Sequence, residues 1–199
     1  LQIGDDDSHT TLTTDGSVIS KGSTILKSAT YVVQTSGSQL GNVSAANSTI
    51  ELGKGRFTIE EFSGTEKTVR FSDLESSSLN IASKMGSMRL SASSQANNQF
   101  TDARSTAQAL LSAVTIEKDG ELTGDSIQIE EGLINDALIA TISEDGTHLE
   151  NIQTTKNTKL LRYNSVALLS AFQWRHDMSD LNKRMGQLRD SPKGVGSWV

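Results

Sequence analysis

Short pairs of apolar residues, each pair separated by one residue, constrain this chain more than any other feature. That spacing puts both side chains on the same face of a β-strand. Gly- and Ser-rich segments typical of turns lie between the pairs, such as Gly53–Gly55 and Ser63–Thr65. The pattern therefore predicts many strands of four or five residues. The clearest pairs are Ile50 and Leu52, Phe57 and Ile59, Val69 and Phe71, Leu79 and Ile81, and Met88 and Leu90.

A looser form of the same pattern precedes these pairs. It predicts strand residues that face a core. Separately, we expect Met85 and Met88 to pack between neighbouring coils. The looser strand residues are Val18, Ile19, Ile25, Leu26, Tyr31, Val33, Leu40 and Val43.

Two architectures accommodate many short strands at this spacing: a sandwich or barrel, and a β-solenoid. The chain contains 28 serines, 20 threonines and one proline, and only 5% of its 199 residues are aromatic. A sandwich needs longer strands and a richer core, whereas each coil of a solenoid buries its small apolar set on the next coil. The composition therefore favours a mainly β fold built as a solenoid, with an irregular Ser/Thr-rich sandwich as the alternative.

The segment after Gln95 has a different pattern. Ala103, Ala107 and Leu110 fall on one helical face with Leu111 and Val114, and Asn98 or Thr101 could cap that helix. Two hairpins are predicted to follow, one turning at Asp119–Gly120 and one joining 137–142 to 147–152 through Glu144–Gly146. Such a helix-plus-hairpin unit would cover the last coil, whose unpaired backbone groups would otherwise be exposed.

The C-terminal segment predicts one long helix from about Asn164 to Asp190, which would be roughly 40 Å long. Asn164 or Ser165 is a plausible N-cap, and Pro192 follows the expected end. Packing against the β body or in a coiled coil is the ordinary interpretation of such a helix. Its heptad-spaced residues are Ala167, Ala171, Trp174, Met178, Leu181, Met185 and Leu188.

The charge distribution marks the same division. Residues 1–150 carry 21 acidic and 10 basic side chains, whereas residues 151–199 carry 3 and 8. We therefore expect a boundary near 155–163 between an acidic β body and a basic tail. Because the chain begins at Leu1 without a signal peptide, we interpret it as a segment of a longer protein.

The tail carries the most specific motif. Asp180–Asp190 reads DLNKRMGQLRD, and Gly194–Val199 reads GVGSWV. This stretch closely resembles the linker helix and first barrel strand of conventional, monomeric bacterial autotransporters. Gln173–His176, just upstream, resembles the AIDA-type adhesin subgroup. The linker residues of this resemblance are Trp174, Met178, Leu181, Asn182, Lys183, Arg184, Met185, Leu188 and Arg189.

The resemblance implies that the β-rich part is the end of a passenger domain, which in this family is a right-handed parallel β-helix. It places an autochaperone region, which promotes passenger folding during secretion, within Thr49–Ala92, with the five strand pairs above as its core. The implied organisation is β-helix coils over 1–96, a helix-and-hairpin cap over 97–160, a linker helix over 161–191 and a first barrel strand beginning at 192–199.

The resemblance also implies partners and a location. The linker would thread a β-barrel that follows Val199, and the helix is longer than the roughly 25 Å apolar band of such barrels. The implied partners are this barrel and the outer-membrane assembly machinery. Binding to a host-cell surface or self-association would occur through the passenger residues upstream of this chain. The implied location is the outer membrane and surface of a Gram-negative bacterium, with secretion after cleavage as a variation.

The candidate cleavage region departs from the family pattern. Some members cut themselves inside the barrel at an Asn-Asn pair, and Ser179 and Asp180 occupy that place here. Asn cyclisation requires the side-chain amide as nucleophile, and neither residue supplies one. We therefore expect the chain to remain attached or to be cut by another protease.

Composition excludes several other classes. The chain has no cysteine, a net charge of −6 and no apolar run of membrane-spanning length, so thiol chemistry, nucleic-acid binding and a transmembrane helix are not expected. His9, His148 and His176 have no metal or triad spacing. We expect no cofactor, no metal and no catalysis. The remaining alternatives are an adhesive or self-associating surface and a fragment of a β-helix carbohydrate-active enzyme.

Overall fold

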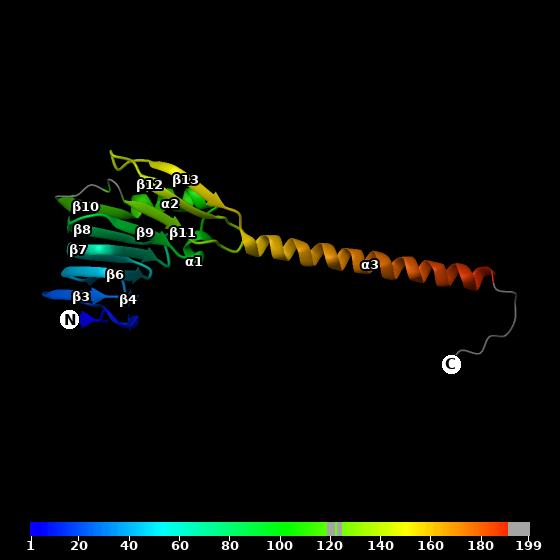
Figure 1. Cartoon of the computed structure of the whole chain (residues 1–199), viewed down its shortest axis with the longest axis horizontal. Helices are drawn as coiled ribbons and strands as arrows, with labels where there is room; N and C mark the ends of the chain where they lie inside the picture. Colours follow the sequence, from blue (N-terminus) through cyan, green and yellow to red (C-terminus); the bar gives the residue numbers. More distant parts are fainter. Residues whose placement is uncertain (119–121, 123–124, 191–199) are drawn as a thin grey trace. The chain divides into compact units, whose positions relative to one another are not determined.

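The computed structural model describes residues 1–118, 122 and 125–190. The chain divides into two compact units, Leu1–Asn157 and Thr158–Val199. The first unit is mostly β and forms a solenoid of about five turns, as the short strand pairs predicted. Figure 1 shows its strands stacked coil upon coil from the N-terminus toward a cap of hairpin and helices.

Most strands of the solenoid run parallel in one 13-stranded sheet that winds around the core. The coil strands are β1 (Gln2–Ile3), β2 (Thr10–Thr14), β3 (Ser23–Lys27), β4 (Ala29–Val33), β5 (Ser38–Gln39), β6 (Asn42–Leu52), β7 (Arg56–Phe71), β8 (Ser78–Lys84), β9 (Met88–Ala92), β10 (Val114–Lys118) and β11 (Ser126–Ile129).

The register reveals the length of a coil. Ser23 pairs with Asn42, and Asn42 pairs with Glu61, so the early coils repeat every 19 residues. The repeat then lengthens, because Lys67 pairs with Met88 and Leu79 with Val114. The longest coil contains α1 (Ser94–Asn97) and α2 (Ala103–Ala113) as an insertion between β9 and β10.

Apolar side chains at equivalent positions stack into continuous rows through the core. Tyr31, Ile50, Val69, Leu90 and Ile127 are successive partners across five strands, and none is more than 2% exposed. Each coil thus buries its apolar residues on the next, which is how a solenoid is stabilised without a wide core. All ten residues of the five strand pairs predicted to face the core are at most 3% exposed.

The coils turn at a corner that requires an unusual backbone conformation. Ser28, Asn47 and Glu66 lie 19 residues apart and have φ of +44°, +46° and +50°. Gly64, two residues before the last of these, has φ of +112°, and a Cβ there would overlap the carbonyl oxygen of Ala45. Only glycine fits this close approach between coils.

The C-terminal end of the solenoid is closed by a change in strand direction. β11 pairs parallel with β9, but β12 (Ala137–Ile142) pairs antiparallel with β11, and β13 (Leu149–Thr155) pairs antiparallel with β12. The expected hairpin around Glu144–Gly146 is therefore present, with a second strand that runs on to Thr155. Helix α2 contacts β9, β11 and β12 and completes the cap.

Two details of the predicted cap are wrong. The N-cap of α2 is Asp102, whose side chain accepts a hydrogen bond from the Ser105 N–H at 2.7 Å, and Val114 belongs to β10. β10 pairs parallel with β8. The turn predicted at Asp119–Gly120 lies outside the described residues.

Three residues predicted to face the core are exposed. Ile19 is 65% exposed, Ile25 is 40% exposed and Met85 is 58% exposed. Ile25 alternates with Thr24 and Leu26, whose side chains are buried, so it lies on the outer face of β3. Met88 alone of the two methionines packs between coils.

The second unit contains helix α3 (Thr158–Asp190), which begins six residues before the predicted start at Asn164. The expected strand at 195–199 lies outside the described residues. Within the part of the chain that the structure describes, no helix is both long and apolar enough to cross a membrane.

Candidate functional site

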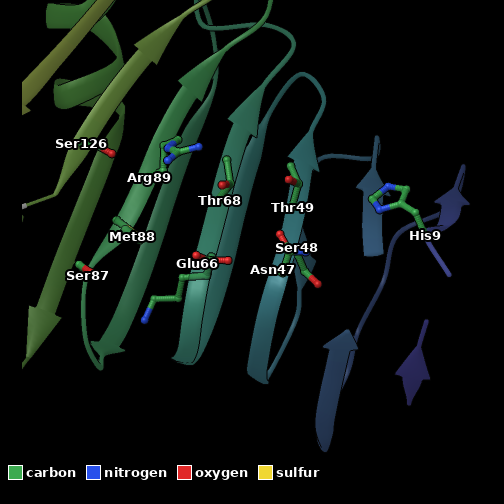
Figure 2. A pocket seen from close by; sticks show the side chains of 11 residues that line it. His9, Asn47, Ser48, Thr49, Glu66, Thr68, Ser87, Met88, Arg89 and Ser126 are labelled. Atoms are coloured by element: carbon green, nitrogen blue, oxygen red, sulfur yellow. The ribbon is translucent and has the colours of Figure 1, made fainter. Parts of the chain in front are cut away.

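An open groove of about 550 Å³ runs across the outer face of one side of the solenoid. Thr30, Thr49, Thr68, Arg89 and Ser126 are successive register partners along this face. The last four of these line the groove, and Figure 2 shows them side by side on neighbouring strands. The solenoid therefore presents one polar side chain per coil, about 4.8 Å apart, the strand spacing.

The corner residues form one margin of this groove. Asn47 and Glu66, both exposed and both at positive φ, lie there beside Ser87. His9 lines the opposite end, and its Nε2 lies 3.0 Å from Thr30 Oγ1. The groove is thus rich in hydroxyl, amide and charged groups and can form hydrogen bonds with an extended polar ligand.

The groove lacks the elements of the common hydrolytic sites. Glu66 is the one carboxylate among its described lining residues, whereas glycoside hydrolysis ordinarily uses two. Within residues 1–118, 122 and 125–190, no group of three or more His, Asp or Glu side chains is arranged to hold a metal ion.

A buried ion pair connects the cap to the solenoid. Lys84 Nζ lies 2.7 Å from Asp125 Oδ2, and the two side chains are 5% and 0% exposed. Asp125 Oδ1 accepts a second hydrogen bond from the Met88 N–H at 2.8 Å. Burial raises the pKa of Asp125, and the hydrogen bonds from Lys84 and Met88 oppose that rise. The pair joins the end of β8 and the start of β9 to the chain leading into β11.

A second buried lysine lies one coil away. Lys67 is 1% exposed, its Nζ donates to the carbonyl oxygens of Phe62 and Met85, and it lies 5.2 Å from the centre of the Phe62 ring. Loss of solvation lowers the pKa of Lys67, and the positive charge of Lys84 lowers it further. The corner of the solenoid therefore contains two buried amines and one buried carboxylate.

Helix α3 exposes large apolar side chains along its described length. Trp174 is 67% exposed, Met178 is 42% exposed and Leu181 is 55% exposed, and these three share one face at heptad spacing. Phe172, on another side of the helix, is 63% exposed. Such exposure is uncommon for a helix in its final environment, because it leaves apolar area in water. The helix is a candidate contact surface.

The structure places the remaining predicted linker and cleavage residues in the same helix. Asn182 and Lys183 are exposed, and Ser179 lies in mid-helix. Asp180 lies 3.7 Å from His176 and 4.0 Å from Lys183. The side chains of Arg184, Met185, Leu188 and Arg189 lie outside the described part of the helix.

Sequence reasoning missed the groove and the ion pair. Lys84 and Asp125 are 41 residues apart, and charged residues in Ser-rich segments ordinarily lie at the surface. The groove is formed by side chains that the pairing of neighbouring coils brings together. No local sequence motif predicts which residues of successive coils pair.

Comparisons with known proteins add no relative. No protein-family model, no curated protein and no solved structure matches this chain.

Proposed function

We propose that this chain is the C-terminal passenger stalk of a bacterial autotransporter adhesin, with its autochaperone region and its linker helix. The observation that carries the proposal is the helix α3, which follows a capped β-solenoid directly and exposes Trp174, Met178 and Leu181. A helix of this kind needs an enclosing partner. The motif at Asp180–Asp190, which resembles an autotransporter linker, supports the protein's own β-barrel as that partner.

In this proposal the solenoid and cap promote folding of the passenger outside the cell. Closed coils with in-register apolar rows supply a template on which the preceding coil can pair. The ten apolar residues from Ile50 to Leu90 form this template, and the outer-membrane assembly machinery inserts the barrel. The protein is then located at the outer membrane and cell surface and reaches it by type V secretion.

The test replaces a core residue of the template in the native full-length protein. Ile81 is fully buried, so Ile81→Asp buries a charge without a partner and should disrupt the terminal coils. Met85, four residues away, is 58% exposed, and Met85→Asp is the matched control. We expect Ile81→Asp to reduce surface display several-fold, with Leu79→Asp behaving similarly, while Met85→Asp leaves it unchanged.

Display is measured by access of an external protease to the passenger, with the amount of barrel in the outer membrane measured separately. Normal display of Ile81→Asp would remove the autochaperone assignment.

A second candidate function is adhesion or self-association through the solenoid itself. The groove with Thr49, Thr68, Arg89 and Glu66 favours it, because these polar groups line a continuous track across the coils. The chain would then bind host glycans or a second copy without its barrel. Binding of the wild-type chain to a glycan array, lost in Arg89→Ala, supports this candidate, and absence of binding by the wild type removes it.

A further inference from the structure

Three buried asparagines meet where the chain leaves the cap. Asn97 is 0% exposed, Asn135 is 5% exposed and Asn157 is 2% exposed. They come from the end of α1, the loop between β11 and β12, and the last residue before α3. We call these three residues the asparagine cluster.

Each member donates both hydrogens of its side-chain amide to backbone carbonyl oxygens. Asn97 Nδ2 donates to Glu130 at 2.8 Å and Asp136 at 3.1 Å. Asn135 Nδ2 donates to the carbonyl of Asn97 at 2.7 Å and of Phe100 at 2.8 Å.

The third member connects the exit of the chain to the same loop. Asn157 Nδ2 donates to the carbonyls of Gly132 at 3.0 Å and Asn135 at 2.9 Å. Its backbone N–H donates to Asp136 Oδ1 at 2.8 Å. The cluster therefore ties together segments far apart in sequence, and it does so with amides that satisfy the carbonyls of an irregular loop.

The position of Asn157 relative to β13 gives the cluster its mechanical importance. β13 ends the sheet and pairs only with β12 among the described strands, and Thr155 pairs with Ala137 at its C-terminal end. A pull transmitted through α3 enters the cap at Asn157. Without the cluster, the first pair of β13 with β12 that the pull would reach along the chain is Thr155 with Ala137.

We propose that the asparagine cluster keeps the cap closed and takes the tension applied through helix α3. The hydrogen bonds of Asn157 to Gly132, Asn135 and Asp136 lie between α3 and the first pair of β13 along the chain, so a pull through α3 reaches them first. The tension in this inference rests on the proposed function, in which α3 tethers the solenoid to a barrel. Closure of the cap by the cluster does not rest on it.

Hydrogen exchange on the 199-residue chain tests the closure. Asn157→Ala removes two donors from buried carbonyls, and we expect amides of β12 and β13 to exchange roughly tenfold to a hundredfold faster. Amides of β6 and β7 should keep their wild-type rates. The matched control is Asn42→Ala, because Asn42 is exposed at the start of β6, and this variant should exchange as the wild type does.

Unchanged hydrogen exchange of the β13 amides in Asn157→Ala would overturn the inference. Equally faster exchange throughout the solenoid would also overturn it, because Asn157 would then contribute to the stability of the whole solenoid and not to closure of the cap. If Asn157→Ala does not fold, Asn157→Ser, which retains one donor, is measured with the same criteria.

A force measurement tests the tension. The chain has no cysteine, so Lys54→Cys in an exposed turn and Asn182→Cys on α3 provide unique attachment points. We expect the cap to open at a lower force in Asn157→Ala than in the wild type, and equal forces would refute the tension. If the native protein proves to have no barrel, the proposed function fails, whereas the exchange result still decides whether the cluster closes the cap.

Discussion

Removing one member of the buried pair Lys84–Asp125 should destabilise the solenoid strongly, whereas removing both charges should not. Asp125→Asn preserves the size of the side chain and an oxygen that can accept from the Met88 N–H. It deprives the buried ammonium of Lys84, 5% exposed, of its carboxylate. Breaking a buried pair in this way costs about 3–5 kcal/mol, a large share of a typical domain's free energy of unfolding.

The double variant Lys84→Met/Asp125→Asn tests whether such a loss of stability comes from the buried charge of Lys84 or from the substitution at Asp125 itself. It removes both charges and keeps the acceptor for Met88, so we expect it to lie within about 1–2 kcal/mol of the wild type. The coupling between the two substitutions is then at least about 2 kcal/mol, which a double-mutant cycle resolves.

Urea unfolding followed by circular dichroism in the β-sheet region is the suitable assay, because both tryptophans lie in the C-terminal tail, beyond the solenoid. The reasoning is refuted if Asp125→Asn loses less than about 1 kcal/mol, or if the double variant is as unstable as that single variant.

Three further substitutions test other parts of the account. Gly64→Ala should cost at least about 2 kcal/mol in urea unfolding, because φ is +112° and the new Cβ would overlap the Ala45 carbonyl; a neutral result would contradict the close packing of coils. The pKa of Lys67 is lowered in the folded state, so the unfolded chain binds more protons between that pKa and 10.5, and wild-type stability should rise with pH across this window. Lys67→Met should lack this rise, and identical pH profiles by urea unfolding would show that the buried amine is not the cause. Leu181 belongs to the second compact unit, so Leu181→Asp should leave the unfolding midpoint of the solenoid unchanged, and a drop in that midpoint would contradict the independence of the two units.

The strand pairs show what local sequence can predict. Phe57 and Ile59 or Leu79 and Ile81 alternate with polar residues between turn segments, and all four are buried in parallel strands. The predicted strand length is wrong for the first pair, because β7 is 16 residues long. The 19-residue repeat has no signature in the side chains, because the corner positions Ser28, Asn47 and Glu66 share a backbone conformation and no side-chain chemistry. Pairing between coils depends on that repeat.

The errors arise from non-local pairing. Val114 is predicted to lie on the face of a helix, but it begins β10, whose partner β8 lies more than thirty residues earlier in the chain. No local pattern marks Lys84 or Asn157 as buried, because their burial depends on partners such as Asp125 and Gly132 that distant segments supply. A local pattern identifies which residues face a core more readily than which polar groups meet inside it.

Peptide mapping of the native protein by mass spectrometry, in membrane and secreted fractions, tests the proposed function most directly. The account predicts peptides that continue past Val199 in an outer-membrane band, and any release site within Met178–Arg189 would appear as a new terminus there. A native chain that ends at Val199 and is recovered in soluble form would contradict the proposed stalk and tether. A β-solenoid whose C-terminal helix has another partner would then be the better account.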